Sequence, residues 1–232
     1  MGIVGIIVGI LFGLAIPIVI IAGIVYFILR IKSGITITIS FRFALRVYFY
    51  VAILVSIGLA GLGGLSTLIN VGFGEIVDRE FSYGYVYEEH RKMQNRLEND
   101  NYIYENGDTE RSLPDKVELE MKSSVINGIS LTMIGTFLLI VHFLGRIWVE
   151  TKDEGSDVLR RLYLIIGLAI FAIVTVISLA TGVPETLRYA LLDMNPGEES
   201  PGEALAIAIV ALPIWVCYLV ATLRNVRLAN VV

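Results

Sequence analysis

The chain has 232 residues, of which 56% are hydrophobic and only 17% charged, and its mean hydropathy is +0.75. This balance excludes an ordinary soluble domain, in which about a quarter of the residues are charged. The formal net charge is −4, and a single cysteine, Cys217, excludes a disulfide framework within the chain. Composition therefore predicts an integral membrane protein.

Five apolar runs are long enough to cross a hydrocarbon core about 30 Å thick, which takes roughly 20 residues of helix. None of the runs contains Asp, Glu or Lys away from its ends. We predict an all-α integral membrane protein with five transmembrane helices: one anchor helix, then two parallel helix pairs. The spans are approximately Ile3–Leu29, Ala44–Val71, Val125–Val149, Leu162–Val183 and Ala204–Leu223.

The first run is predicted to stay as an anchor and not to be removed as a secretory signal. No basic residue precedes it, it is too long for a signal, and Arg30 and Lys32 follow it. Gly5, Gly9 and Gly13 recur every four residues and share one face of this helix. Such a face favours close helix packing in lipid, either against another helix of this chain or as a seam for self-association.

Residues 35–40 alternate between apolar and polar side chains, which is the period of a strand. A lone strand at a membrane surface needs a partner, so we predict an extended linker, with pairing to a neighbouring chain as the alternative.

In the second run, Ala60 and Gly64 form another pair of small residues four apart. They predict tight packing against a neighbouring helix.

The longest polar stretch, residues 75–124, is predicted to form a small acidic cap outside the cytoplasm. Within it, Glu88 to Leu97 has the pattern of a helix, and Asn106-Gly107 is a turn signal that suits a hairpin. Rings in such a place usually anchor the protein at the headgroups. The aromatic residues are Phe81, Tyr83, Tyr85, Tyr87, Tyr102 and Tyr104.

Proline and glycine mark the boundaries near the C-terminus. Pro184 suits the first turn of a new short helix after the fourth span, and Asn195-Pro196-Gly197 is expected to break the chain. The fifth helix is predicted to begin near Pro201, because Ser200 and Glu203 form a capping-box pattern around it.

Basic residues predict the orientation, because cytoplasmic loops retain Lys and Arg. The first and third connections and the tail are basic, whereas the other two connections are acidic. This alternation predicts a bacterial cytoplasmic membrane protein with its N-terminus outside and its C-terminus in the cytoplasm. The basic residues are Arg30, Lys32, Arg42, Arg46, Arg146, Lys152, Arg160, Arg161, Arg224 and Arg227.

An Arg-x-Tyr motif opens two of the runs, at Arg46-Val47-Tyr48 and Arg161-Leu162-Tyr163. We interpret the repeat as two copies of one helix-pair unit. The predicted domains are the anchor at residues 1–32, a first repeat at 33–157 that includes the cap at 75–124, and a second repeat at 158–232.

Pro213-x-Trp215 lies in the middle of the last run, and a basic residue closes that run. Together with the Arg-x-Tyr opening, this pattern resembles a bacterial membrane domain family of unknown function built from helix pairs. The family has a His or Trp after its Pro-x-Trp, whereas this chain has Tyr218 near that place. The resemblance implies architecture and no activity.

Arg46, Tyr48, Arg161 and Tyr163 lie at the predicted cytoplasmic edge. Anchoring at the interface is the usual role of such residues. The alternative is a basic pocket between helices that binds an anionic lipid headgroup.

His142 is the single histidine within a predicted span, and His90 is expected on the opposite side, so the two should not ligate one haem. We predict no cofactor, metal site or catalytic set, and no nucleic-acid binding. No predicted span holds a buried carboxylate that would mark an ion pathway.

The sequence favours a non-catalytic membrane scaffold or accessory subunit that associates with itself, with lipid or with another membrane protein. The alternative is a small transporter or channel subunit. Its path would be lined by hydroxyl residues, although such side chains more often bond back to their own helices. They are Ser130, Thr132, Thr136, Thr175 and Ser178.

Overall fold

A computed structural model describes residues 41–99, 111–150, 158–192 and 197–229 of the chain. The regular elements of these residues are all helical. They are α2 (Phe41–Ile57), the π-helix η1 (Gly58–Leu65), α3 (Ser66–Ile76), α4 (Arg79–Asn99), α5 (Leu113–Val149), α6 (Val158–Leu191) and α7 (Gly202–Ala229).

Four helical stretches are long and apolar enough to cross a membrane: Phe41–Ile76, Leu113–Val149, Val158–Leu191 and Gly202–Arg227. They contain the second to fifth predicted spans, so the chain has the helices of a multi-pass membrane protein. The first predicted span, with Gly5, Gly9 and Gly13, lies outside the described residues, as do the linker at 35–40 and the turn at Asn106-Gly107.

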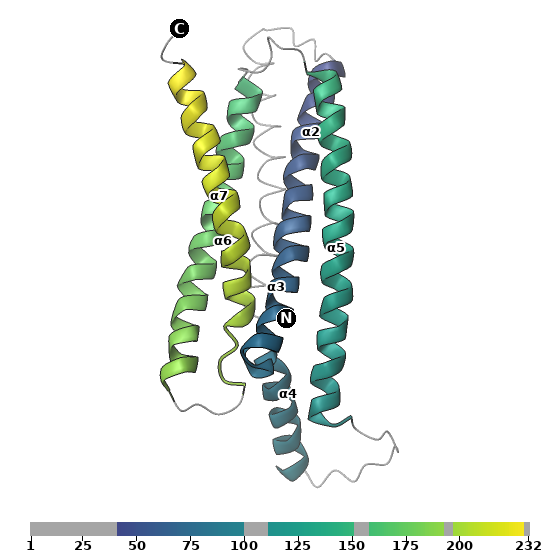
Figure 1. Ribbon diagram of the computed structural model, residues 1–232, viewed down its shortest axis with the longest axis vertical. Helices are drawn as coiled ribbons and strands as arrows, with labels where there is room; N and C mark the ends of the chain where they lie inside the picture. The colour runs from purple at the N-terminus through teal and green to yellow at the C-terminus, as the bar shows by residue number, and fades with distance from the viewer. Residues whose placement is uncertain (1–40, 100–110, 151–157, 193–196, 230–232) are drawn as a thin grey trace.

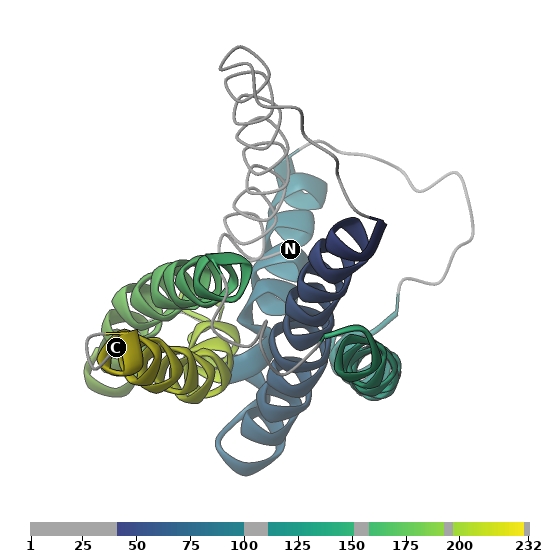
Figure 2. The ribbon, with the colours of Figure 1, turned by 90° about the horizontal axis from the view of Figure 1, so that it is seen from above.

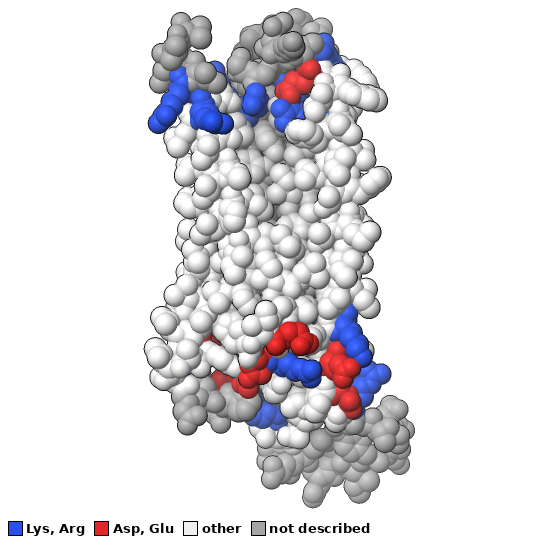
Figure 3. All heavy atoms as spheres, viewed as in Figure 1, with Lys and Arg blue, Asp and Glu red and all other residues white. Residues whose placement is uncertain are grey.

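The continuous rod formed by α2, η1 and α3 lies in the middle of the described bundle. Helix α5 packs along one side of it, and the hairpin of α6 and α7 lies on the other side (Figures 1 and 2). In Figure 3 the charged side chains gather at the two ends, and the face between them is uncharged. That uncharged belt is what a hydrocarbon core requires of a protein surface.

Backbone contact joins η1 to α5, as the pair Ala60 and Gly64 predicted. A Cβ atom added to Gly64 would lie 2.5 Å from the backbone nitrogen of Thr132. One added to Gly135 would lie 2.5 Å from the backbone nitrogen of Ala60. Only glycine fits such a separation, so the two helices pack through van der Waals contact of their backbones, which replaces the hydrophobic effect in lipid.

On its other side, η1 packs against α7. Gly61 faces the side chains of Val210 and Ile214, and Leu62 packs against a buried cluster shared by α6 and α7. The π-helical winding of η1 was not predicted from its sequence, Gly-Leu-Ala-Gly-Leu-Gly-Gly-Leu. Such windings are rare and frequent at functional sites.

The expected helix at 88–97 is confirmed as part of the longer α4, which bends at Tyr83. Helix α5 begins inside the stretch predicted as a cap, at Leu113, where the Ser112 hydroxyl accepts a hydrogen bond from the Asp115 amide.

The expectation of a new helix at Pro184 was wrong, because α6 runs through this proline to Leu191. The Thr186 hydroxyl donates to the Gly182 carbonyl oxygen at 2.5 Å, which adds a hydrogen bond beside the proline. Prolines are tolerated in membrane helices when such side chains and neighbouring helices satisfy the backbone. Helix α7 begins at Gly202, one residue after the predicted start at Pro201.

Candidate functional site

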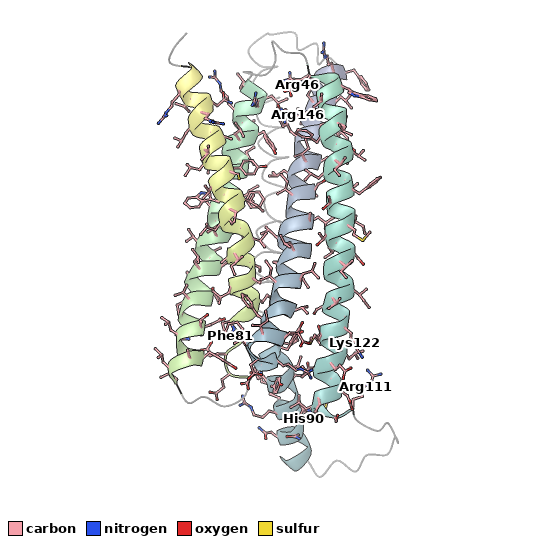
Figure 4. All side chains as sticks on the ribbon, viewed as in Figure 1. Arg46, Phe81, His90, Arg111, Lys122 and Arg146 are labelled. Carbon is pink, nitrogen blue, oxygen red and sulfur yellow. The ribbon has the colours of Figure 1, made fainter. Side chains whose placement is uncertain are left out.

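A cavity of about 270 Å³ lies among η1, α3, α4, α5 and α7 at the end of the bundle where α4 packs. In Figure 4 the label Lys122 shows where the cavity lies along α5, because Lys122 stands between the lining residues Glu120 and Ser124. Most of the lining residues carry polar groups. They are Leu62, Ser66, Thr67, Asn70, Tyr83, Tyr85, Glu120, Ser124, Glu203 and Ile207.

Two carboxylates face this cavity. Glu120 projects from the second turn of α5 and accepts a 2.8 Å hydrogen bond from the Tyr85 hydroxyl. Glu203 lies in the first turn of α7 and receives no hydrogen bond from the residues that the structure describes. Burial raises the pKa of Tyr85, and its hydrogen bond to Glu120 raises that pKa further, so Tyr85 is a stable donor.

Two polar atoms beside the cavity are buried without a protein partner. The Tyr83 side chain is 1% exposed, and its hydroxyl has no well-formed hydrogen bond, although Ser124 lies close to it. The side-chain oxygen of Asn70 has none either among the described residues. Buried polar groups are nearly always hydrogen-bonded, so these atoms indicate a site that water or a ligand completes.

The helices α3, α4 and α7, which carry these atoms or lie beside them, are packed closely against one another. The Ser82 hydroxyl donates to the Asn70 carbonyl oxygen at 2.7 Å and joins α4 to α3. Gly74 admits the Tyr83 ring, because a Cβ at this position would lie 3.1 Å from it. Gly202 lies against Asn70 and Ser82 in the same way. The site is therefore built on packed helices and not on a loop.

The sequence reasoning missed this cavity. Glu120 and Glu203 lie just beyond the ends of the predicted spans, where the search for carboxylates within the spans could not find them. The hydroxyls predicted to line a path do not line this cavity. Ser130 and Thr136 are exposed, and Thr132 and Thr175 each donate to the carbonyl oxygen four residues earlier in their own helix.

At the opposite end of the bundle, four side chains from α2 and the end of α5 form a buried charged cluster. Glu150 accepts hydrogen bonds from Arg46 at 3.3 Å, Tyr50 at 2.7 Å and Arg146 at 2.7 Å. The Arg146 guanidinium also lies 4.6 Å from the centre of the Tyr50 ring. Figure 4 shows both arginines at this end.

The charge balance of this cluster favours ionised Glu150. Burial opposes its ionisation, but the hydrogen bonds from Tyr50 and the two arginines, with the charge of Arg146, lower its pKa below the ordinary value of 4.5. The Arg46 side chain is only 4% exposed. The cluster fixes α2 to α5, and Arg42 adds hydrogen bonds of 2.8 and 3.0 Å to the Val149 carbonyl oxygen.

The four residues predicted to bind a lipid headgroup do not surround one pocket. Arg46 is buried against Glu150, whereas Arg161 is exposed. Tyr48 is 54% exposed and forms a 2.9 Å hydrogen bond with His142. Lipid binding at these positions stays a prediction.

The Tyr163 side chain lies between α6 and α7. Its hydroxyl lies 2.6 Å from the hydroxyl of Tyr218, whose ring stacks on Phe171. Gly167 gives Tyr218 its room, because a Cβ there would overlap the ring. Tyr218 is thus a core residue that joins α6 to α7. It lies near the position at which the helix-pair family described above has His or Trp.

Comparisons with models of protein families, with curated proteins and with solved structures found no match. The resemblance to a helix-pair membrane family therefore stays a prediction.

Proposed function

We propose that this protein is a non-catalytic, solute-binding membrane protein of the small-transporter class, and that the polar cavity is its binding site. The observation that carries the proposal is the cavity itself, with two carboxylates and an unpartnered tyrosine hydroxyl among packed helices. Ligand sites in helix bundles lie between the helices and hold a few convergent polar groups, as this cavity does. This reverses the order of the two functions that the sequence favoured.

The distribution of basic residues supports an orientation in which the cavity opens away from the cytoplasm. At the end opposite α4, the described helices carry seven arginines, and Glu150 is the one acid among the described residues there. The α4 end also carries basic residues, but there they stand among more numerous acids. We therefore propose the end opposite α4, which is almost free of acids, as the cytoplasmic end of a bacterial cytoplasmic membrane protein. The arginines are Arg42, Arg46, Arg146, Arg160, Arg161, Arg224 and Arg227.

In this proposal the two helix pairs are parallel repeats. Support comes from packing, since α6 pairs with α7, and the rod of α2, η1 and α3 pairs with α5. The cavity lies where residues of the first pair meet α7 of the second. Parallel repeats related by an axis along the membrane normal are a known plan for transporters that bind solute between repeats.

Uptake into liposomes tests the transport function. Proteoliposomes and empty liposomes are mixed with a neutral polyol, a small ammonium ion and a zwitterionic amino acid, and the entry of each is followed. We expect protein-dependent entry of at least one of them. The double variant Glu120→Gln/Glu203→Gln should abolish that entry, and Glu118→Gln should preserve it, because Glu118 pairs with Lys122 at the surface. Equal entry into both kinds of liposome would overturn the proposal.

A scaffold function remains the second proposal, and the exposure of α5 supports it. In the most apolar 18-residue stretch of α5 only 11% of the residues are buried, whereas 33 to 39% are buried in the corresponding stretches of the other three spans. A second copy or another membrane protein would cover this face. The mass of the purified protein in native lipid particles tests this: a defined oligomer or a foreign subunit is expected, and a lone monomer would refute it. Gly9→Leu, in the self-association seam predicted for the first span, should weaken such an assembly.

A further inference from the structure

We infer that the cavity binds a small primary ammonium ion that carries no carboxylate, with Glu203 as its counter-ion. The inference rests on the proposed function, since it names the ligand class of the same site. Three properties of the lining residues lead to it: their charge, their hydrogen-bonding groups and the size of the space they enclose.

The charge of the lining is negative. It contains Glu120 and Glu203, and none of the described lining residues is basic. Basic side chains nearby are engaged elsewhere, since Lys122 pairs with Glu118 and Arg188 pairs with Glu199. A carboxylate removed from water is costly unless a cation accompanies it. The cavity thus favours a cation and disfavours an amino acid, whose own carboxylate would meet Glu203.

The hydrogen-bonding groups of the lining favour a donor. Glu203 receives no hydrogen bond from the described residues, and the side-chain oxygen of Asn70 has no partner there either. The Tyr83 hydroxyl, also unpartnered, accepts as well as donates. A primary ammonium group brings three N–H donors to this set of acceptors. A quaternary ammonium ion has the same charge and no donor.

Size and composition limit the rest of the ligand. A cavity of about 270 Å³ is slightly smaller than the usual small-molecule site, which encloses about 300 to 1,000 Å³. Leu62 and Ile207 give it an apolar part that suits a short alkyl chain. Metal ions are a poorer match, because the described residues contain no group of three His, Cys, Asp or Glu side chains that would hold one.

Titration calorimetry on the full chain in lipid nanodiscs tests the inference. The probes are ethanolammonium, tetramethylammonium, glycine and Mg²⁺ at equal ionic strength. We expect ethanolammonium to bind at least tenfold more tightly than the other three. Glu203→Gln should weaken this binding by about 10- to 100-fold, which is the range for a hydrogen bond between charged groups. Glu118→Gln, an exposed acid on α5, should leave the affinity unchanged.

Tyr83→Phe provides a second variant that removes a single oxygen atom. Because that hydroxyl has no well-formed hydrogen bond within the protein, the variant should fold and lose affinity for ethanolammonium a few-fold. The inference is overturned if ethanolammonium does not bind, if tetramethylammonium, glycine or Mg²⁺ binds as tightly, or if neither variant changes the affinity.

The outcomes also separate this inference from the transport function. Binding of ethanolammonium without uptake would preserve the ligand class and remove transport. Uptake of a neutral polyol, with no binding of ethanolammonium, would preserve transport and refute the ligand class.

Discussion

Replacing Gly135 by alanine should destabilise the bundle, because the added methyl group has no room. Its Cβ would lie 2.5 Å from the backbone nitrogen of Ala60 and 2.8 Å from its Cα and Cβ atoms, whereas ordinary contacts fall between 3.4 and 4 Å. The obstacle is backbone and cannot rotate away, so α5 and η1 must separate by about 1 Å. Overpacking of this kind costs about 1 to 3 kcal/mol.

Alanine also favours the helical state over glycine by up to about 1 kcal/mol, which opposes this loss. The net destabilisation expected for Gly135→Ala is therefore about 1 to 2 kcal/mol. Gly72→Ala is the matched control: this glycine is also helical, but a Cβ there would have no neighbour within 4 Å. It should be neutral or stabilising.

Unfolding in mixed micelles on addition of sodium dodecyl sulfate, followed by circular dichroism, measures both variants. The expected order of stability is Gly72→Ala, then the parent chain, then Gly135→Ala. If Gly135→Ala is as stable as Gly72→Ala, the backbone contact between η1 and α5 is not as close as described, and the reasoning fails.

Three further predictions concern the end opposite the cavity. Glu150→Gln should cost about 1 to 3 kcal/mol, between the values for exposed and buried ion pairs, since it leaves Arg46 and Arg146 without their shared acid. Because folding lowers the pKa of Glu150, its stabilisation is present above pH 4.5 and lost as the pH falls through the lowered value. Melting curves against pH should show this loss in the parent chain and not in Glu150→Gln. Gly167→Ala should destabilise the α6–α7 pair, and its melting temperature should recover partly when Tyr218→Leu is added. Arg161→Ala should reduce co-purifying anionic lipid, if this exposed arginine binds headgroups; unchanged lipid content would refute that role.

Much of the fold followed from local patterns that tertiary structure does not alter. Apolar runs of about 20 residues can be satisfied in lipid only as helices, so four of the predicted spans appear within the described residues. The spacing of Ala60 and Gly64 likewise fixed a small-residue face, and that face is in contact with α5. Pro184 misled because its local signal for a helix start is overridden inside a packed membrane helix.

The candidate site depended on contacts that no local pattern contains. Glu120 and Glu203 lie far apart in the chain and just outside the runs that hydropathy detects, so in sequence they resemble ordinary residues of helix ends. The kink at Tyr83 and the packing of α4 against α3, α5 and α7 enclose them in one cavity.

Packing between distant helices also gives the two Arg-x-Tyr motifs different surroundings. Both were predicted at a membrane edge, yet Arg46 is buried against Glu150 while Arg161 is exposed. The sequence by itself determined which segments are helical and apolar, because that depends on the solvent that each segment meets. Only the tertiary structure decided which charges are buried together, because that depends on how helices from distant parts of the chain pack.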